Sequence, residues 1–238
     1  MPVPASVEAI AAGRALHPVW ENELGGLTFA VGSGPDACFV KWAPAGTGVD
    51  FAPEATRLTW AGEFTPVPRV LGQGADDDGS WLITAPVAGQ SAVCEKWKSD
   101  PARAVAAIGV GLRALHDALP VDRCPFSWSV GDRLDDARRR GVAAQRIDAV
   151  PDAPPVDRLV VCHGDACTPN TLITDDGQWS GHVDFGSLGV ADRWADLAIA
   201  TWSSVWNYGP GWEGRLLDAY GIAEDAARSH YYRLLWDL

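Results

Sequence analysis

The stretch His163-Gly164-Asp165-Ala166-Cys167-Thr168-Pro169-Asn170, followed by Val183-Asp184-Phe185-Gly186, carries the chemistry around which this chain is organised. Moving a phosphoryl group from a nucleotide to a hydroxyl requires a carboxylate that orients the hydroxyl and oxygen ligands that hold Mg²⁺ against the phosphates. Asn170 lies five residues after Asp165, and Asp184 lies fourteen residues after Asn170. The two motifs at this spacing predict a metal-assisted phosphoryl-transfer site.

The polar residues of these motifs have different expected roles. Asp165 follows the apolar run Leu159-Val160-Val161-Cys162, so a strand should present it at its end as the catalytic carboxylate. Asn170 and Asp184 are hard oxygen donors, which suit Mg²⁺. The ordinary alternatives are a loop-capping role for Asp165 and a turn role for Asp184. His163 is expected to be a structural hydrogen-bonding residue, because Asp165 already fills the catalytic role.

A lysine in an apolar strand indicates the nucleotide side of the site. Lys41 interrupts the run from Ala37 to Trp42, and a buried ammonium is costly unless it is paired. Glu54, at the start of the next expected helix, is the natural partner, and such a pair holds nucleotide phosphates in phosphoryl-transfer enzymes. The alternatives are an edge-strand lysine and an ordinary acidic residue in a first helical turn.

Two backbone regions are further candidates for nucleotide binding. Gly25 and Gly26 precede an expected strand, where a phosphate-covering loop needs close backbone approach. No full G-x-G-x-x-G motif surrounds them, so this assignment rests on their position. The backbones of Ala85 and Val87, in a turn-prone segment, are where we expect an adenine edge to bond.

Composition limits the classes of protein to consider. A chain of 238 residues with 47% hydrophobic content can bury a sizeable core in one large domain or two lobes. No apolar run approaches the roughly 20 residues that span a bilayer, and the start Met1-Pro2-Val3-Pro4-Ala5 lacks a signal-peptide layout. We therefore expect a cytoplasmic protein. Its five scattered cysteines, without a CxxC pair, are expected to be reduced thiols.

The charge balance restricts the partners. A formal net charge of −12, from 19 basic and 31 acidic residues, opposes nucleic acid and anionic membrane surfaces as partners. The same charge favours a cationic small molecule, although an acidic surface can also serve solubility alone. The sequence leaves the oligomeric state open.

The pattern along the chain predicts an α+β protein with two lobes. Residues 1–88 are expected to form a small β-rich lobe with one helix, over 53–61, between two hairpins. The first hairpin turns at 32–36 and the second at 74–79. A hinge is expected near 84–90, followed by a larger, mainly helical lobe over 89–238.

Helices are expected in the second lobe over 100–119, 130–147, 193–205, 212–219 and 226–235. Asp192 and Asp196 stand four residues apart, so they are expected on one helical face. In that position one would cap the helix and the other would brace the catalytic loop.

Several segments carry a family resemblance. They are Phe39 to Pro44 with Lys41, Glu54, Trp81 to Thr84, Leu115 to Asp117, Cys124 to Phe126, His163 to Asn170, Gly181 to Gly186, Ala191 to Leu197 and Tyr231 to Leu238. With these residues the chain resembles aminoglycoside O-phosphotransferases of the 3'- and 3''-phosphorylating kind, the kanamycin and streptomycin kinases, over nearly its full length. It departs from them at Ala166 and Ser187, where leucine and a basic residue are common.

The resemblance implies a bilobal, protein-kinase-like fold that uses ATP, or GTP as an alternative donor, with Mg²⁺. It implies Asp165 as the catalytic aspartate, Asn170 and Asp184 as metal ligands, and Lys41 with Glu54 at the phosphates. The last segment is similar to the acidic tail with which these enzymes hold antibiotic amines. Asp237 and the C-terminal carboxylate of Leu238 are therefore implied substrate contacts.

The function expected on this basis is ATP-dependent phosphorylation of an aminoglycoside hydroxyl, giving antibiotic resistance. One alternative is a kinase of another small alcohol, such as a macrolide or a choline-like metabolite. Another is a catalytically silent nucleotide-binding scaffold, although the presence together of Lys41, Asp165, Asn170 and Asp184 argues against it.

Overall fold

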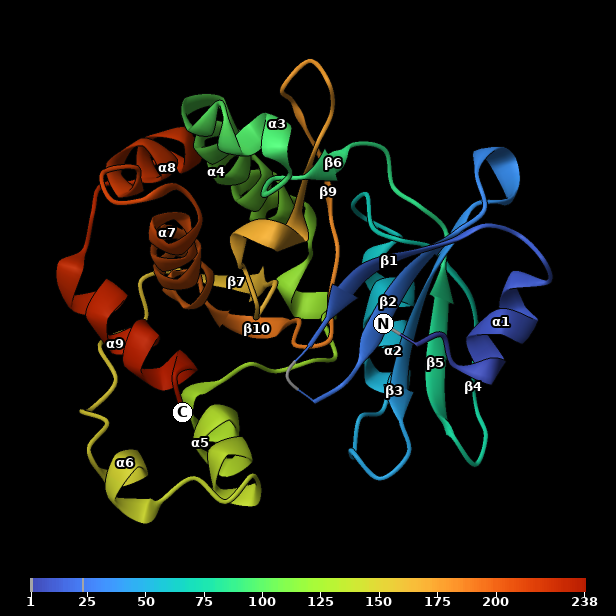
Figure 1. The fold of residues 1–238 in the computed structure, drawn as a ribbon. Helices are drawn as coiled ribbons and strands as arrows, with labels where there is room; N and C mark the ends of the chain where they lie inside the picture. Colours follow the sequence, from blue (N-terminus) through green and yellow to red (C-terminus); the bar gives the residue numbers. More distant parts are fainter. Residues whose placement is uncertain (1, 23) are drawn as a thin grey trace. The chain divides into compact units, whose positions relative to one another are not determined.

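A computed structural model describes residues 2–22 and 24–238 of the chain. It divides the chain into two compact units, shown in Figure 1. The first unit comprises Met1–Glu63 and Val67–Val87, and the second comprises Phe64–Pro66 and Ala88–Leu238.

The first unit is built on a five-stranded antiparallel sheet. Its strand order is β1 (Leu16–Glu21), β2 (Leu27–Val31), β3 (Cys38–Pro44), β5 (Gly79–Thr84) and β4 (Val70–Ala75). Both expected hairpins are confirmed, since β2 pairs with β3 and β4 pairs with β5. The second turn is shorter than expected, because Gly74, Ala75 and Gly79 belong to the strands.

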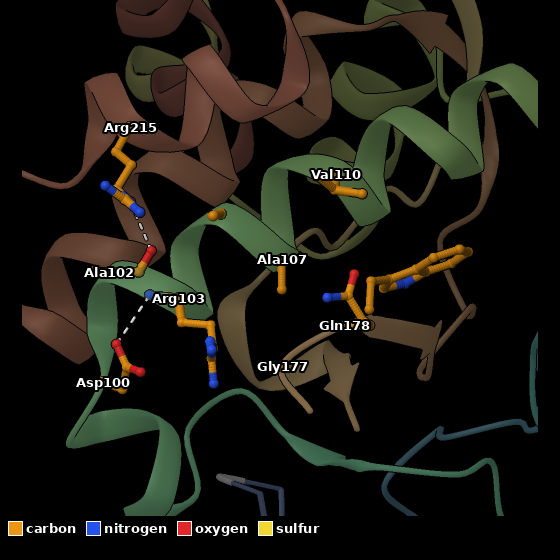
Figure 2. Close-up of a pocket in the computed structure, with 10 residues that line it drawn as sticks. Asp100, Ala102, Arg103, Ala107, Val110, Gly177, Gln178 and Arg215 are labelled. Atoms are coloured by element: carbon orange, nitrogen blue, oxygen red, sulfur yellow. Dashed lines mark hydrogen bonds between the residues drawn. The ribbon is translucent and has the colours of Figure 1, made fainter. Parts of the chain in front are cut away.

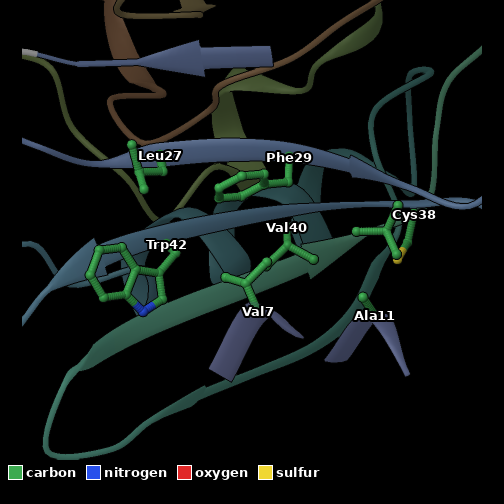
Figure 3. Packing of buried hydrophobic residues seen from close by; sticks show 8 residues of the cluster. Val7, Ala11, Leu27, Phe29, Cys38, Val40 and Trp42 are labelled. Atoms are coloured by element: carbon green, nitrogen blue, oxygen red, sulfur yellow. The ribbon is translucent and has the colours of Figure 1, made fainter. Parts of the chain in front are cut away.

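The first unit contains two helices rather than the one expected. Helix α2 (Ala52–Ala61) is the predicted one, and α1 (Ala5–Ala11) and strand β1 were missed. Helix α1 has seven residues and buries only Val7 and Ala11, which is too few for a periodic pattern. Figure 3 shows these two side chains against the buried residues of the sheet. Strand β1 is largely exposed, so its sequence shows no alternation.

The second unit is mainly helical (Figure 1). Its helices are α3 (Glu95–Lys98), α4 (Pro101–Ala118), α5 (Val130–Arg139), α6 (Ala144–Asp148), α7 (Trp194–Tyr208), α8 (Glu213–Tyr220) and α9 (Ala226–Trp236). Short 3-10 turns span Gly34–Asp36 in the first unit and Val121–Arg123 and Thr168–Asn170 in the second. Helices α4 and α7 are the most deeply buried, and Asp100 caps α4 by accepting from the Arg103 amide.

The expectation of one helix over 130–147 is wrong. Helix α5 ends at Arg139, and α6 begins at Ala144. Gly141 lies between them with a φ of 79°, a left-handed conformation that ends helices and that glycine adopts readily. The other four expected helices of this unit are confirmed as α4, α7, α8 and α9.

Two small sheets of the second unit position the motifs. Strand β7 (Leu159–Cys162) pairs with β10 (Gly189–Asp192), and β8 (Thr171–Ile173) lies between β6 (Gln90–Ser91) and β9 (Trp179–His182). The His163–Asn170 loop therefore follows β7, and Asp184 follows β9. The Val183 amide donates to the Asn170 carbonyl at 3.0 Å, which ties the two motifs together.

Two general observations concern the described residues. No disulfide links the five cysteines, of which Cys38 and Cys162 are buried. In the part of the chain that the structure describes, no helix has the length and apolar character needed to cross a bilayer.

Candidate active site

The candidate catalytic loop, residues 163–170, holds one oxygen of Asp165 and leaves the other without a partner among the described residues. The Asn170 amide nitrogen Nδ2 donates to the Asp165 backbone carbonyl at 3.0 Å and to its Oδ2 at 3.2 Å. The Asp165 Oδ1 atom is buried and has no hydrogen-bond partner among the described residues. Buried carboxylate oxygens are normally bonded, so an orphaned one indicates a position where a ligand donor fits.

His163 fixes the backbone of the loop. Its Nδ1 accepts from the Asp165 amide at 3.3 Å, and its Nε2 lies 2.9 Å from the Val183 carbonyl oxygen. With Nδ1 accepting, Nε2 is the ring nitrogen that donates to the Val183 carbonyl. This arrangement agrees with the structural role expected from the sequence.

Gly164 is required by a close backbone approach. A Cβ atom at this position would lie 2.1 Å from the Ser187 carbonyl oxygen and 2.8 Å from the Trp128 ring. The residue also has a φ of 81°, which side chains rarely tolerate. Glycine therefore occupies the position at which the protein-kinase catalytic loop carries arginine, because a side chain here would clash.

Asp196 braces the loop from the buried helix α7. Its carboxylate accepts from the His163 amide at 2.6 Å and from the Gly164 amide at 2.9 Å. The His116 Nε2 atom lies 2.9 Å from the same carboxylate, and His116 Nδ1 lies 2.8 Å from the Tyr220 hydroxyl. Burial acts to raise the pKa of Asp196, but the hydrogen bond and charge of His116 hold that pKa below its ordinary value.

Asp192 does not share a helical face with Asp196, which corrects the sequence expectation. It is the last residue of β10, and α7 begins only at Trp194. Its carboxylate accepts from the Asp157 amide at 2.7 Å and from the Trp194 amide at 3.0 Å. Among the residues that the structure describes, Asp196 accepts hydrogen bonds from amides of the 163–170 loop, whereas the Asp192 carboxylate accepts from amides outside it.

The residues expected to hold Mg²⁺ have suitable chemistry. The Asn170 NH₂ group donates to Asp165, so its amide oxygen is the atom left to bind a metal ion. Asp184 is exposed and has a φ of 69°, a strained conformation for a residue other than glycine. Burial raises the pKa of the Cys167 thiol, and the charges of Asp165 and Asp184 raise it further. Hard carboxylate and amide oxygens of this kind fit Mg²⁺.

A second group of potential metal ligands lies below the loop. His116, Cys162 and Asp196 offer ligand atoms that are all within 4.8 Å of one another, and all three residues are buried. Burial raises the pKa of the Cys162 thiol well above its ordinary value, so the thiolate that a metal requires is disfavoured. Because His116 and Asp196 are bonded to each other, this group is structural.

Lys41 and Glu54, which are predicted to contact the nucleotide phosphates, lie in the first unit. Lys41 Nζ contacts Glu54 Oε1 at 2.6 Å, as expected, with side chains that are 24% and 8% exposed. Strand β3 is central, between β2 and β5, so Lys41 is not an edge-strand lysine. Glu54 is buried, so it is not an ordinary solvated acid of a first helical turn.

The glycine and hinge candidates are placed in the same unit. The Gly25 amide donates to the Asn22 carbonyl at 3.0 Å, and the Gly26 amide donates to Asn22 Oδ1 at 2.7 Å. A phosphate contact to either amide would require these bonds to open. The Ala85 amide donates to the Arg69 carbonyl at 2.8 Å, so the Ala85 carbonyl and the Val87 backbone remain as candidates for adenine.

The acidic tail is not a free chain end. Asp237 is exposed, and Arg146 Nη2 donates to its carbonyl at 2.8 Å and to its Oδ2 at 3.1 Å. The Leu238 side chain is only 8% exposed. Arg146 thus pairs with the Asp237 carboxylate, which the resemblance implies as a substrate contact.

Comparison with known proteins identifies the family. The family model described as the phosphotransferase enzyme family matches residues 21–231. The chain belongs to the phosphotransferase enzyme family. It is 34% identical to an aminoglycoside 3'-phosphotransferase of Streptomyces fradiae over 253 aligned positions, covering 92% of this chain and 93% of that protein. The family resemblance recognised in the sequence is therefore confirmed.

Solved structures of family members confirm the kinase-like fold. A crystal structure of a type VIII aminoglycoside-3'-phosphotransferase is 31% identical with a TM-score of 0.79, covering 94% of this chain and 93% of that one. An aminoglycoside phosphotransferase of Streptomyces rimosus, in complex with ADP and streptomycin, is 26% identical with a TM-score of 0.71. That match covers 97% of this chain and 94% of the other.

Sequence reasoning missed one cation of this phosphotransferase. Arg133 of α5 lies over the Trp128 ring at 5.0 Å, and Trp128, together with Ser187, limits the space at Gly164. Burial lowers the pKa of Arg133, while the charges of Asp136 and Asp165 act to raise it. The charge of Asp165 therefore acts on this arginine. No local motif marks it, because its neighbours on α5 are ordinary surface charges.

His182 is expected to make the stability of the phosphotransferase depend on pH. Both ring nitrogens are buried without a hydrogen-bond partner in residues 2–22 and 24–238. Burial lowers the pKa of His182 well below 6.5, and the neighbouring His163 and His116 lower it further. In the unfolded chain His182 is therefore protonated below pH about 6.5. In the folded protein the same protonation occurs only at lower pH.

We expect His182→Leu to reduce the loss of stability on acidification. In the wild type, this histidine should cost up to about 1.4 kcal/mol per pH unit below pH about 6.5, and nothing above it. Urea unfolding at pH about 7.5 and about 5.5 measures the difference. Parallel pH dependences for the two proteins would show that His182 does not titrate as inferred.

A pocket of about 420 Å³ lies elsewhere in the second unit (Figure 2). Helix α4, the β8–β9 turn and α8 supply its lining, namely Asp100, Ala102, Arg103, Ala106, Ala107, Val110, Gly177, Gln178, Trp179 and Arg215. None of the site residues predicted from the sequence lines this pocket.

Proposed function

We propose that this protein transfers the γ-phosphoryl group of ATP to a hydroxyl of an aminoglycoside antibiotic and thereby confers resistance. The observation that carries the proposal is the orphaned, buried Oδ1 of Asp165 beside an Oδ2 that Asn170 holds in place. This geometry suits a carboxylate that receives a hydroxyl hydrogen. Family membership and the aminoglycoside 3'-phosphotransferase of S. fradiae support the substrate class.

In this proposal Asp165 orients the acceptor hydroxyl and takes up its proton during transfer. Phosphoryl transfer depends mainly on positioning and electrostatics, so the aspartate need not be a strong base. The brace from Asp196 to the His163 and Gly164 amides holds the loop that carries it. The catalytic side is therefore pre-organised by contacts within the second unit alone.

The nucleotide would be bound by residues of the first unit. Lys41, held by Glu54, would contact the α- and β-phosphates. The backbones of Ala85 and Val87 would bond the adenine edge of ATP, or the guanine edge of GTP. Gly25 and Gly26 would approach the phosphates after their bonds to Asn22 open. The structure of the S. rimosus relative with ADP supports nucleotide binding.

Asn170 and Asp184 would hold Mg²⁺, which neutralises phosphate charge when bound. The oxygen donors of these residues fit that ion. We place the reaction in the cytoplasm, where ATP and Mg²⁺ are supplied.

The acceptor is proposed to be polycationic. The net charge of −12 favours such a molecule, and the S. rimosus relative binds streptomycin. Asp237 and Leu238, the substrate contacts that the family resemblance implies, would meet its amines. A substrate amine would have to replace Arg146 on Asp237. This exchange is feasible because an exposed ion pair contributes only about 0–1 kcal/mol.

The test of the proposed function is ADP release measured with a panel of acceptors. Kanamycin, neomycin and streptomycin are the expected substrates, and a macrolide and choline are the controls. We expect at least one aminoglycoside to accelerate ADP release strongly over the acceptor-free rate. Acceleration by the macrolide or choline alone would contradict the proposed acceptor class.

We expect Asp237→Ala to raise the acceptor KM several-fold while the ATP KM changes by less than about twofold. Arg146→Ala should act in the opposite direction, because it removes the cation that competes for Asp237. Asp218→Ala, which removes an exposed carboxylate of α8, is the matched control. Equal effects of Asp237→Ala on both KM values would show that the tail is not part of the acceptor site.

A further inference from the structure

We propose that Trp202, Trp206 and Trp236 form an aromatic subsite that binds one ring of the cationic acceptor beside the catalytic loop. This inference rests on the proposed function, because it names where a part of that substrate is held. Trp202 and Trp206 lie outside the segments that carry the family resemblance, whereas Trp236 lies in the tail segment Tyr231 to Leu238.

The three indoles form one cluster. The Trp202 and Trp206 ring centroids are 4.7 Å apart, and the Trp236 ring lies 6.3 Å from Trp202 and 6.0 Å from Trp206. Trp206 is 50% exposed, and the other two rings are partly buried. Large aromatic surface that remains open to solvent within such a cluster is typical of a binding face.

The position of the cluster on α7 follows from helix geometry. Ser203 of α7 accepts from the Thr168 amide of the catalytic loop at 2.9 Å, which marks the side of the helix that faces the loop. At about 100° per residue, Trp206 projects about 60° and Trp202 about 100° from Ser203 in the same rotational direction. The two indoles therefore project from α7 within about 100° of the side that faces the loop.

The face of α7 that contacts helix α9 lies further around α7 in the same rotational direction. Arg233 of α9 donates to the Ala198 carbonyl at 3.2 Å and to the Thr201 hydroxyl at 3.1 Å. Ala198 and Thr201 lie about 140° and about 200° from Ser203 in that direction, so both indoles lie between the two contact faces. Helices α7 and α9 pack side by side in Figure 1. Trp236 completes the cluster from α9, directly before Asp237.

The chemistry of this face suits an aminoglycoside ring. Indole faces attract ammonium and guanidinium groups through the ring quadrupole and pack against the C–H face of a sugar. The Arg233 guanidinium already lies 5.9 Å from the Trp202 centroid, which shows that a cation is accommodated against this cluster. The carboxylate of Asp237, the residue directly after Trp236, would add charge complementarity for an amine on the same ring.

The experiment compares acceptor and ATP kinetics in tryptophan variants. Trp206→Ala should raise the KM for the aminoglycoside that the wild type uses by about tenfold, with the ATP KM changed by less than about twofold. Trp206→Phe keeps an aromatic face and should recover most of that loss. Trp20→Ala removes a 61% exposed tryptophan of the first unit and should leave both constants unchanged. Thermal unfolding of each variant checks that it is folded.

The outcomes separate this inference from the proposed function. If the wild type uses no aminoglycoside, the proposed function fails, and this inference fails with it. If the wild type is active but folded Trp206→Ala keeps its acceptor KM, only the aromatic subsite is overturned. The aromatic subsite is also overturned if Trp206→Ala changes the oligomeric state on gel filtration without changing that KM. The tryptophan face would then be an interface with a second copy of the chain.

Discussion

Asp165→Ala should abolish phosphoryl transfer while Mg²⁺-dependent nucleotide binding persists. The variant removes the orphaned Oδ1 that is proposed to receive the hydroxyl hydrogen. A positioned acid or base contributes about 10²–10⁴-fold to rate, so we expect kcat to fall by about 10³-fold or more. Kinetics of ADP release measure the loss, and calorimetric titration with a non-hydrolysable ATP analogue measures binding.

Asp218→Ala, which removes an exposed carboxylate of α8, is the control for the loss of one negative charge. It should keep both turnover and nucleotide affinity. Near-normal turnover in Asp165→Ala would contradict the assignment of the catalytic residue. Loss of the analogue's binding together with turnover would indicate a structural role for Asp165 instead.

Asp196→Ala should destabilise the second unit and also slow catalysis in the fraction that folds. The carboxylate is fully buried and accepts from two backbone amides and His116. Removal of one partner of a buried charged network costs about 3–5 kcal/mol. The Asp196 pKa is lowered in the folded state, so its stabilisation is present above pH about 4 and lost as pH falls through the lower folded value.

The matched control for Asp196→Ala is Asp192→Ala. Asp192 is also buried, but it bonds the Asp157 and Trp194 amides rather than the catalytic loop. Urea unfolding should show destabilisation of both variants. Hydrogen exchange at the His163 and Gly164 amides should accelerate most in Asp196→Ala, with a larger loss of kcat. Equal losses of kcat in the two variants would show that the brace has no specific role.

The sequence predicts those parts of the fold that have strong local patterns. The alternation of β2 and the long buried face of α4 identify these elements, and the two motifs identify the catalytic loop. Helix α1 and strand β1 lack such patterns, because one buries only two residues and the other is mostly exposed. They are held by tertiary packing on the sheet rather than by local signals.

The supporting contacts of the site are long-range and were not predictable from spacing. His116 reaches Asp196 across 80 positions of the sequence and Tyr220 across 104. The need for glycine at 164 comes from the Ser187 carbonyl, on a segment that follows the second motif. The Arg146 contact with Asp237 likewise joins α6 to the chain end across 91 positions. Such contacts depend on how the helices pack, which a single sequence does not specify.

The most direct test of the central claim is transfer of label from γ-labelled ATP to a purified aminoglycoside. We expect the label to appear on kanamycin, neomycin or streptomycin in proportion to the ADP formed, and to be absent with Asp165→Ala. Release of the label only as inorganic phosphate, or no ADP formation with any of these acceptors, would contradict the account.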